Sequence, residues 1–307
     1  MSDPTSPATL KFGNIELAIN PSNDEHAQAF VPTWDDHHEF DADLLESLAV
    51  GLALDMPVLV VGPTGCGKTS TVRNLAAAVN QPVRRINLHG DVRSADLVGE
   101  KALEVDAESG ESVTEWRDGV LPDAWRNGYW LLLDEFDAMP PHVAFILQAA
   151  LEGGDLVLAD NHGEVIPRHP NTRIIATANT IGRGDESGLY TGTNVLNEAT
   201  LDRFSVVEVD YVGKAQEEAI LVARTGLAKA EAKKLVEAAS EIRSALKRGD
   251  CYATLSTRRL VAWGLFAKAL GSVEKAYGMA VRNKLAGEDR EFFDGVMQRV
   301  IGFTPKQ

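Results

Sequence analysis

The chain has 307 residues, of which 44% are apolar, so it can form one large domain or two modest ones around a hydrophobic core. Its net charge of −15 argues against nucleic acid as the main partner. No apolar run approaches the roughly 18 residues of a membrane span and no apolar leader is present, so we expect a protein that is neither membrane-spanning nor secreted. The two cysteines, Cys66 and Cys251, suit neither a disulfide framework nor a metal spacing, and favour a reducing, cytoplasmic location.

The N-terminal part of the chain shows little regular pattern. Residues 1–28 are rich in Ser, Pro, Asn and Asp without a sustained period, and we expect them to form a weakly ordered arm. Residues 32–40 form an acidic stretch in which His37 and His38 stand side by side. Because adjacent positions do not converge easily on one ion, a solvated polar loop is predicted here rather than a metal site.

The clearest motif follows a short apolar run, Val58 to Val61, and matches the phosphate-binding loop G-x-x-x-x-G-K-[ST] at every fixed position. Its glycines allow a tight turn whose N–H groups, with the N-terminus of the following helix, can surround the β- and γ-phosphates of a nucleotide. Lys68 would add a positive charge at those phosphates, and the Thr69 hydroxyl would bind Mg²⁺. The predicted nucleotide-binding residues are Gly62, Pro63, Thr64, Gly65, Cys66, Gly67, Lys68, Thr69 and Ser70.

Strands and helices alternate around this loop, which indicates an α/β domain with an open parallel sheet covered by helices on both faces. Two segments of alternating polar and apolar residues, 101–116 and 156–166, are predicted to be projecting hairpins that serve as contact devices, unless they are inert elaborations of the surface. The predicted strands are 58–61, 83–88, 129–133, 173–177 and 205–210, and the predicted helices lie over 41–54, 72–79 and 142–151.

From about residue 214 the pattern changes to helices alone, so a separate small helical domain is predicted. Gly226, Gly249 and Gly271 separate successive helices, as glycine does at helix C-termini. The predicted domains are therefore an arm over 1–28, a nucleotide-binding domain over 29–212 and a helical domain over 213–307. The predicted helices of the last domain are 215–225, 230–248, 256–270, 273–285 and 289–301.

Charge is distributed unevenly between the two ends of the chain. Residues 1–56 contain 11 acidic residues and one basic residue, a balance of −10. Residues 213–307 contain 17 basic and 11 acidic residues, a balance of +6. Two interpretations remain open, a solvated acidic N-terminus and attraction between opposite ends of neighbouring subunits.

Two further segments carry residues suited to phosphate chemistry. An apolar run ends in Asp134 and Glu135, where Asp134 can hold Mg²⁺ through its water shell and Glu135 can polarise the water that attacks the γ-phosphorus. The third acid, Asp137, is interpreted as a residue at the approach to the next helix. Asn179 follows the next predicted strand, where its amide could hydrogen-bond both the γ-phosphate and the attacking water.

The order and spacing of these features resemble the AAA+ ATPases, in which the position of Asn179 is called sensor 1. The segment Leu201-Asp202-Arg203-Phe204 looks like the one that sends an arginine finger into the neighbouring subunit's nucleotide, and the resemblance assigns that role to Arg203. Near residue 256 the chain resembles the helix start with the sensor 2 arginine, for which Arg258 is a better match than Arg259. The resemblance implies a P-loop NTPase domain with a five-stranded parallel sheet, a helical lid, ATP and Mg²⁺ as cofactors, and the catalytic set Glu135, Asn179, Arg203 and Arg258.

Longer stretches narrow the resemblance to the MoxR branch of the AAA+ proteins, which has two such hairpins. Residues 87–99, 114–122 and 176–193, continuing to Arg203, are similar to the small ATPase subunit of aerobic cobaltochelatase, over roughly residues 30–303 in all. The resemblance implies a homo-oligomeric ring of six subunits that couples ATP turnover to remodelling of a partner. The implied partners are a von Willebrand A-domain protein and a large corrin-binding chelatase subunit.

Three functions are therefore in competition. The first is the motor subunit of a metal chelatase that inserts cobalt into a corrin, and the second is a MoxR-type chaperone that activates a different enzyme or complex. Nothing in the chain alone separates these two, whereas neighbouring genes would. The third, a nucleic-acid translocase, is disfavoured by the acidity of the chain.

Overall fold

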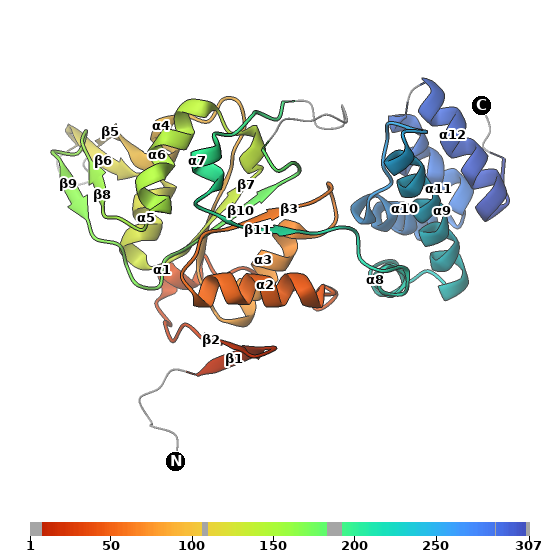
Figure 1. The fold of residues 1–307 in the computed structure, drawn as a ribbon, viewed down its shortest axis with the longest axis horizontal. Coiled ribbons are helices and arrows are strands. Elements are labelled where there is room, and N and C mark those ends of the chain that lie inside the picture. The colour runs from red at the N-terminus through yellow and green to blue at the C-terminus, as the bar shows by residue number, and fades with distance from the viewer. Residues whose placement is uncertain (1–7, 106–109, 183–191, 286, 305–307) are drawn as a thin grey trace, which may run out of the picture.

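A five-stranded parallel sheet forms the centre of the computed structural model, which describes residues 8–105, 110–182, 192–285 and 287–304. The strands are β3 (Val58–Val61), β4 (Val83–Asn87), β7 (Trp130–Asp134), β10 (Arg173–Ala178) and β11 (Ser205–Glu208). They lie in the order β11-β3-β10-β7-β4, so β3 is flanked by β10 and β11 (Figure 1). Because all five run parallel, their carboxyl ends, and the polar residues that follow them, meet at one edge. The predicted sheet is confirmed.

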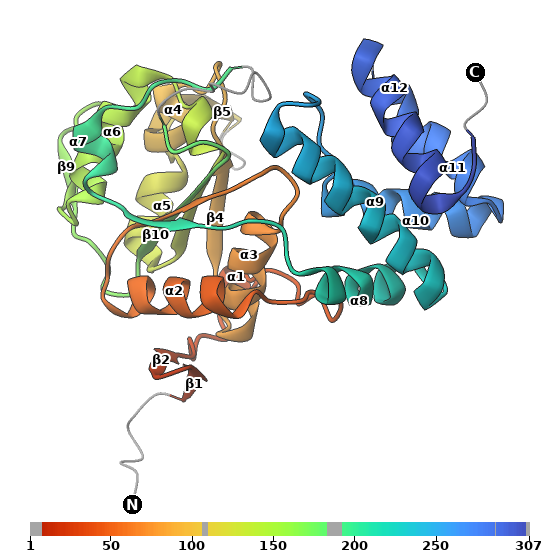
Figure 2. The same ribbon diagram turned by 45° about the vertical axis from the view of Figure 1, so that its right-hand side comes forward.

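Helices cover both faces of the sheet because successive residues of each buried strand point into two different apolar cores. Val58 and Val60 belong to the core with helices α2 and α3, whereas Leu59 and Val61 belong to the core with α5 and α6 (Figure 2). The helix α2 is capped by Asp41, whose carboxylate accepts from the N–H of Leu44 at 2.9 Å. The bounds are α2 (Ala42–Ala53), α3 (Lys68–Ala78), α5 (Val120–Asn127) and α6 (Pro141–Leu151).

Both predicted hairpins are present, and one arginine ties them together. The first consists of β5 (Gly99–Val105) and β6 (Ser112–Asp118), and the second of β8 (Leu156–Leu158) and β9 (Glu164–Ile166). The predicted tip of the first hairpin at residues 106–109 lies outside the described residues. On α5, Arg126 donates to Asp118 of β6 and to Glu164 of β9, each at 2.8 Å. The two hairpins are thus positioned by the same helix.

The N-terminal segment is more ordered than its composition suggested. In place of a weakly ordered arm through residue 28, the structure has a hairpin of β1 (Thr9–Phe12) and β2 (Ile15–Ala18), followed by the short α1 (Glu25–Gln28). The two-residue turn begins at Gly13, whose φ of +60° favours glycine. Leu17 is buried in the core beside α2, so docking on α2 stabilises a pair of strands too short to persist alone.

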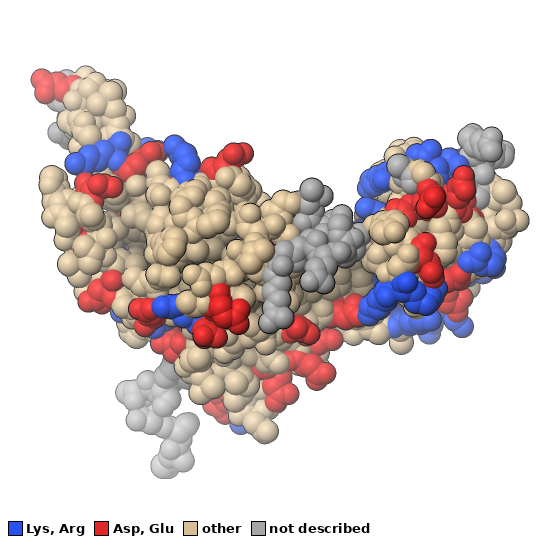
Figure 3. Space-filling model, turned by 45° about the horizontal axis from the view of Figure 1, so that its top comes forward, with Lys and Arg blue, Asp and Glu red and all other residues tan. Residues whose placement is uncertain are grey.

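The C-terminal helices form their own apolar core around Trp263 and Tyr277, beside the sheet domain (Figure 2). Gly226, Gly249 and Gly271 end three of the helices in the left-handed conformation, as predicted. Lysine and arginine side chains gather over these helices among acidic ones (Figure 3). The elements are α8 (Lys214–Thr225), α9 (Lys229–Arg248), α10 (Thr257–Leu270), α11 (Val273–Ala280) with the 3₁₀ turn η2 (Arg282–Lys284), and α12 (Gly287–Val296) with the π-helical turn η3 (Met297–Ile301).

Sequence reasoning missed the short helices α1, α4 (Ser94–Val98) and α7 (Glu198–Leu201), together with α5. Helices of one or two turns are too short to show a helical period. In the described part of the chain, no helix combines the length and the apolar character needed to cross a bilayer.

Candidate functional site

A cavity of about 870 Å³ opens where the carboxyl ends of the strands face the helical domain. Its walls come from the phosphate loop after β3 and the carboxyl ends of β4, β7 and β10 on one side and from α8 and α10 on the other. The loop over residues 32–40 and the segment after β11 complete them. Most of the predicted site residues line this cavity, whereas Gly62, Pro63 and Arg203 are not part of its lining. The predicted residues that line it are Thr64, Gly65, Cys66, Gly67, Lys68, Thr69, Ser70, Asp134, Glu135, Asn179 and Arg258.

The phosphate loop runs from the end of β3 to the start of α3. Gly65 and Gly67 have φ angles of +70° and +111°, which residues with a Cβ rarely adopt. A Cβ on Gly65 would also lie 2.9 Å from the side chain of Ser256, just before α10. The loop therefore needs glycine at this position both for its backbone turn and for its close contact with the helical domain.

Lys68 joins the phosphate loop to β10. Its Nζ donates to the carbonyl oxygens of Gly62 at 2.7 Å and Pro63 at 3.1 Å, and to Oδ1 of Asn179 at 3.0 Å. Burial lowers the pKa of Lys68, and the carboxylates of Asp137 and Asp134 act against that shift. Three oxygen acceptors thus hold the ammonium group at the floor of the cavity.

Asp134 is the centre of a polar cluster at the end of β7. The buried carboxylate accepts from the hydroxyl of Thr69 at 2.8 Å, from the hydroxyl of Thr177, and from Nε of Arg85 at 2.9 Å. The Thr69 hydroxyl and the Asp134 carboxylate are hard oxygen donors of the kind that Mg²⁺ prefers, so this donor pair fits the metal expected from the sequence. Sequence reasoning missed Arg85 and Thr177, because no local motif marks either residue.

Glu135 lies beside this cluster with an exposed side chain at the cavity wall. Its φ of +56° is uncommon for a residue other than glycine, and it marks the sharp turn from β7 into the 3₁₀ turn η1 (Phe136–Ala138). The turn aims the Glu135 carboxylate at the cavity while the chain itself folds back into the core.

Asp137 lies in the 3₁₀ turn η1 just before α6, as predicted, and it also makes contacts that the sequence did not indicate. Its side chain is 1% exposed, and one of its oxygens, Oδ2, accepts three hydrogen bonds. The donors are the N–H of Asn179 at 3.0 Å, the N–H of Thr180 at 2.8 Å and the hydroxyl of Thr180 at 3.0 Å. Asp137 thereby fixes the backbone of the segment that carries the Asn179 amide.

Comparisons with known proteins agree with this geometry. The family model described as AAA domain (dynein-related subfamily) matches residues 57–204, and the model described as CbbQ/NirQ/NorQ C-terminal matches residues 217–301. The aerobic cobaltochelatase subunit CobS from a Sinorhizobium species is 35% identical over 286 residues, covering 91% of this chain and 85% of the relative. The chain belongs to the AAA+ ATPases of the MoxR branch.

Two other relatives are also similar to this chain, and one solved structure shares its fold. NorQ from Paracoccus denitrificans is 32% identical and covers 76% of this AAA+ protein, which spans 79% of NorQ. CbbQ from Hydrogenophilus thermoluteolus is 30% identical, with coverage of 71% and 77%. A RuvB mutant from Thermotoga maritima has a similar fold, with a TM-score of 0.52 at 15% identity over 89% of this chain and 80% of that one.

The two arginines that the AAA+ resemblance singles out occupy different surfaces. Arg258, at the start of α10, faces the cavity, whereas Arg259 turns away and donates to the carbonyl of Thr254 at 3.0 Å. Arg203 lies after α7, outside the cavity lining, and its guanidinium donates to Glu152 at 3.0 Å and to the carbonyl of Ala199. The cavity of one chain therefore contains Arg258 and lacks Arg203.

The acidic loop over residues 32–40 has no buried residue, as expected of a solvated loop, but two of its side chains make contacts with other elements. His38 is half-buried and its Nε2 lies 3.2 Å from the hydroxyl of Thr71 on α3. On the other side, Asp35 forms an ion pair with Arg224 of α8. Burial lowers the pKa of His38, with Asp35 acting against the shift. The loop thus connects the helix after the phosphate loop to the helical domain.

Proposed function

We propose that this AAA+ protein hydrolyses ATP as the motor of a complex that remodels a partner protein. The proposal is carried by the convergence of Lys68, Asp134, Glu135 and Asn179 on one cavity at the start of α3. These side chains come from three different strand ends, and together they supply a phosphate-binding ammonium, a metal-binding carboxylate, a candidate base and an amide.

In the proposed mechanism each residue has one task. The loop amides and Lys68 bind the β- and γ-phosphates, and the Asn179 amide, already bonded to Lys68, orients the γ-phosphate. Mg²⁺, held through Thr69 and Asp134, would neutralise negative charge on the phosphates. Glu135 holds a water by hydrogen bonding and accepts its proton as the water attacks the γ-phosphorus.

The proposed active particle is a ring of six copies. Arg203 lies outside the cavity of its own chain, so a second chain must supply the guanidinium that stabilises charge on the transferring phosphoryl group. Such a finger is worth about 10³ to 10⁵ in rate. In the single chain the Arg203 guanidinium rests on Glu152, a pair that assembly would have to exchange for the neighbouring phosphate.

The proposed client is a large chelatase subunit, with a von Willebrand A-domain protein as second partner in the cytoplasm. CobS, described as a subunit of aerobic cobaltochelatase, matches almost the whole chain. In the described ranges no three His, Cys, Asp or Glu side chains form a group suited to a metal, so the proposal assigns the cobalt and corrin chemistry to the partners. The match of residues 217–301 to the CbbQ/NirQ/NorQ family favours a second candidate, activation of a different enzyme with a similar A-domain partner.

The test is a pull-down with ATP and the Glu135→Gln variant, which we expect to bind ATP, hydrolyse it slowly and hold its partners. Lys68→Ala serves as the matched control that cannot bind the nucleotide. Two results together support the motor. The wild type releases phosphate, and partner proteins are recovered with Glu135→Gln in ATP but not with Lys68→Ala. Wild-type protein that releases no phosphate with partners present, or equal recovery with Lys68→Ala, contradicts it, and strong stimulation by DNA would indicate a nucleic-acid translocase instead.

A further inference from the structure

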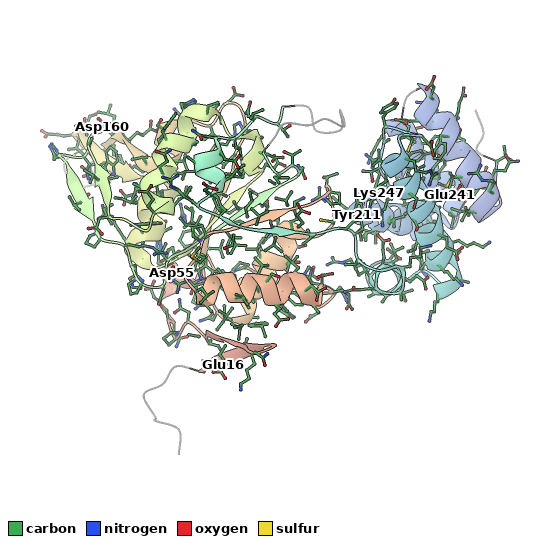
Figure 4. All side chains as sticks on the ribbon, in the orientation of Figure 1. Glu16, Asp55, Asp160, Tyr211, Glu241 and Lys247 are labelled. Atoms are coloured by element: carbon green, nitrogen blue, oxygen red, sulfur yellow. The ribbon has the colours of Figure 1, made fainter. Side chains whose placement is uncertain are left out.

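Tyr211 connects the phosphate loop to the helical domain. It lies in the segment between β11 and α8, at the junction of the two domains (Figure 4). Its hydroxyl donates to the carbonyl oxygen of Thr64, within the phosphate loop, at 2.9 Å. The same hydroxyl lies 3.3 Å from that of Thr254, in the loop before α10. One phenol group thus contacts both the phosphate loop, which lines the nucleotide cavity, and the loop that precedes α10.

The ring of Tyr211 is held in turn by a buried ion pair. The guanidinium carbon of Arg243 lies 3.7 Å from the ring centroid, a cation–π contact. Arg243 on α9 forms a two-pronged bond with Glu217 on α8, with distances of 2.9 and 2.7 Å, and its Nε donates to the carbonyl of Leu255 at 2.8 Å. All of its nitrogens and one of its faces are therefore engaged.

Glu217 links the ion pair to α10, the helix that bears Arg258. The carboxylate is 1% exposed and also accepts from the hydroxyl of Thr257 at 2.5 Å. Thr257 is the first residue of α10, and Arg258 follows it directly. The chain of contacts runs without a gap from the carbonyl of Thr64 through Tyr211, Arg243, Glu217 and Thr257 to the residue beside Arg258.

The charged pair within this chain of contacts calls for a role beyond stability. Burying a carboxylate and a guanidinium carries a desolvation cost that apolar side chains of similar size avoid, so such pairs add little net stability. What the pair does supply is a fixed orientation of the side chains around it, because a planar guanidinium that is hydrogen-bonded on two edges holds its partners in one geometry. Here those partners are the ring that touches the phosphate loop and the start of α10.

We propose that Tyr211 and Thr257, held by the Arg243–Glu217 pair, are positioning residues that set the phosphate loop and Arg258 in register across the cavity. The inference rests on the proposed ATPase function. It assigns no catalytic contact to Tyr211, which does not line the cavity. Thr257 does line it, but its hydroxyl donates to Glu217, and the proposal gives it a positioning role. A movement of the helical domain would therefore shift the phosphate loop through the hydrogen bond of the Tyr211 hydroxyl. Conversely, nucleotide binding at the loop would shift the position of Arg258 through the same contacts.

The test is a double-mutant cycle of Tyr211→Phe with Arg258→Ala, measured as ATP affinity and as kcat. Tyr211→Phe removes one hydroxyl and keeps the ring under Arg243, and the control Tyr252→Phe makes the same change at a tyrosine of the helical domain that is 68% exposed. If the hydroxyl acts through Arg258, Tyr211→Phe lowers kcat or affinity about 3- to 10-fold in the wild type. In the Arg258→Ala background, Tyr211→Phe changes kcat and ATP affinity by less than about 2-fold.

Other outcomes overturn the proposal. They are an equal effect of Tyr211→Phe in both backgrounds, or no effect beyond that of Tyr252→Phe. Thermal unfolding of each variant checks the fold. If Tyr211→Phe unfolds, Thr257→Val, which removes the hydroxyl that contacts Glu217, replaces it in the double-mutant cycle with Arg258→Ala, and the same fold-changes are expected. A wild type that binds ATP without hydrolysing it contradicts the proposed function, while the affinity cycle still decides the positioning role.

Discussion

Asp137 fixes the backbone of Asn179: its carboxylate accepts a hydrogen bond from the backbone N–H of Asn179 at 3.0 Å. The side-chain oxygen of Asn179 in turn accepts a hydrogen bond from Nζ of Lys68 at 3.0 Å. A buried acid next to the candidate carboxylates thus sets the position of the candidate sensor without lining the cavity itself.

Replacement of Asp137 by Ala should both destabilise the protein and slow ATP turnover. It leaves two half-buried backbone N–H groups without their acceptor, which costs at most about 1–3 kcal/mol of unfolding free energy for each unsatisfied group. Urea unfolding measures the first effect and phosphate release the second, with the exposed Asp160→Ala as control. Unchanged turnover in a destabilised Asp137→Ala protein would limit Asp137 to a structural role.

Lys68→Ala and Glu135→Gln should separate nucleotide binding from hydrolysis. Lys68→Ala is expected to abolish detectable ATP binding, a loss of about 100-fold or more in affinity, because the ammonium would make charge-assisted bonds to the phosphates. Glu135→Gln should bind ATP normally and hydrolyse it at least about 100-fold more slowly, since the amide cannot accept the proton of water. Binding of a fluorescent ATP analogue and phosphate release measure the two effects, with the exposed Lys101→Ala and Glu115→Gln as controls. Wild-type turnover in Glu135→Gln would remove Glu135 from the mechanism.

Arg203→Ala should leave ATP binding intact and lower turnover by about 10³-fold, because the group acts on the neighbouring subunit's phosphate. Mixtures of Arg203→Ala with Glu135→Gln should regain activity, since one interface in such a ring combines an intact Glu135 with an intact Arg203. The control is Arg248→Ala, which removes another surface arginine with an acidic partner. Mixtures that assemble and remain inactive would contradict a shared site.

His38 should make the stability of the protein fall as the pH is lowered through about 6.5. Burial lowers its pKa in the folded state below the ordinary value of 6.5, and nearby Arg224 lowers it further while Asp35 acts in the opposite direction. The unfolded chain therefore takes up a proton first as the pH falls through 6.5, which favours unfolding. His38→Gln should flatten this dependence in urea titrations, whereas the exposed His37→Gln should not. An unchanged profile in His38→Gln would exclude His38 as its source.

Assembly should weaken as ionic strength rises if opposite charges at the two ends of the chain attract neighbouring subunits. The balance is −10 over residues 1–56 and +6 over residues 213–307, and about 0.1 M salt screens exposed charges beyond roughly 10 Å. Light scattering between low and high salt measures the effect. Assembly that does not respond to salt would favour the other interpretation, an acidic N-terminus that is only solvated.

Sequence reasoning succeeded where the signal is local. The phosphate loop, the five strands of the parallel sheet, both hairpins and the helix-ending glycines each lie in a short window with its own pattern. It was wrong for residues 9–18, because the apolar residues of that hairpin become meaningful only against α2. It also missed the contacts of Asp137 and His38, because their partners follow much later in the chain.

By itself, the sequence determined that the chain forms a phosphate loop on a parallel sheet followed by a helical domain, since turn geometry and strand burial are set by neighbouring residues. Only the tertiary structure decided which polar groups meet. Lys68 reaches Asn179 across 111 positions, and Tyr211 reaches Thr64 across 147. A buried hydrogen bond depends on where two strand ends or two domains come together in space, and no spacing along the chain encodes that distance.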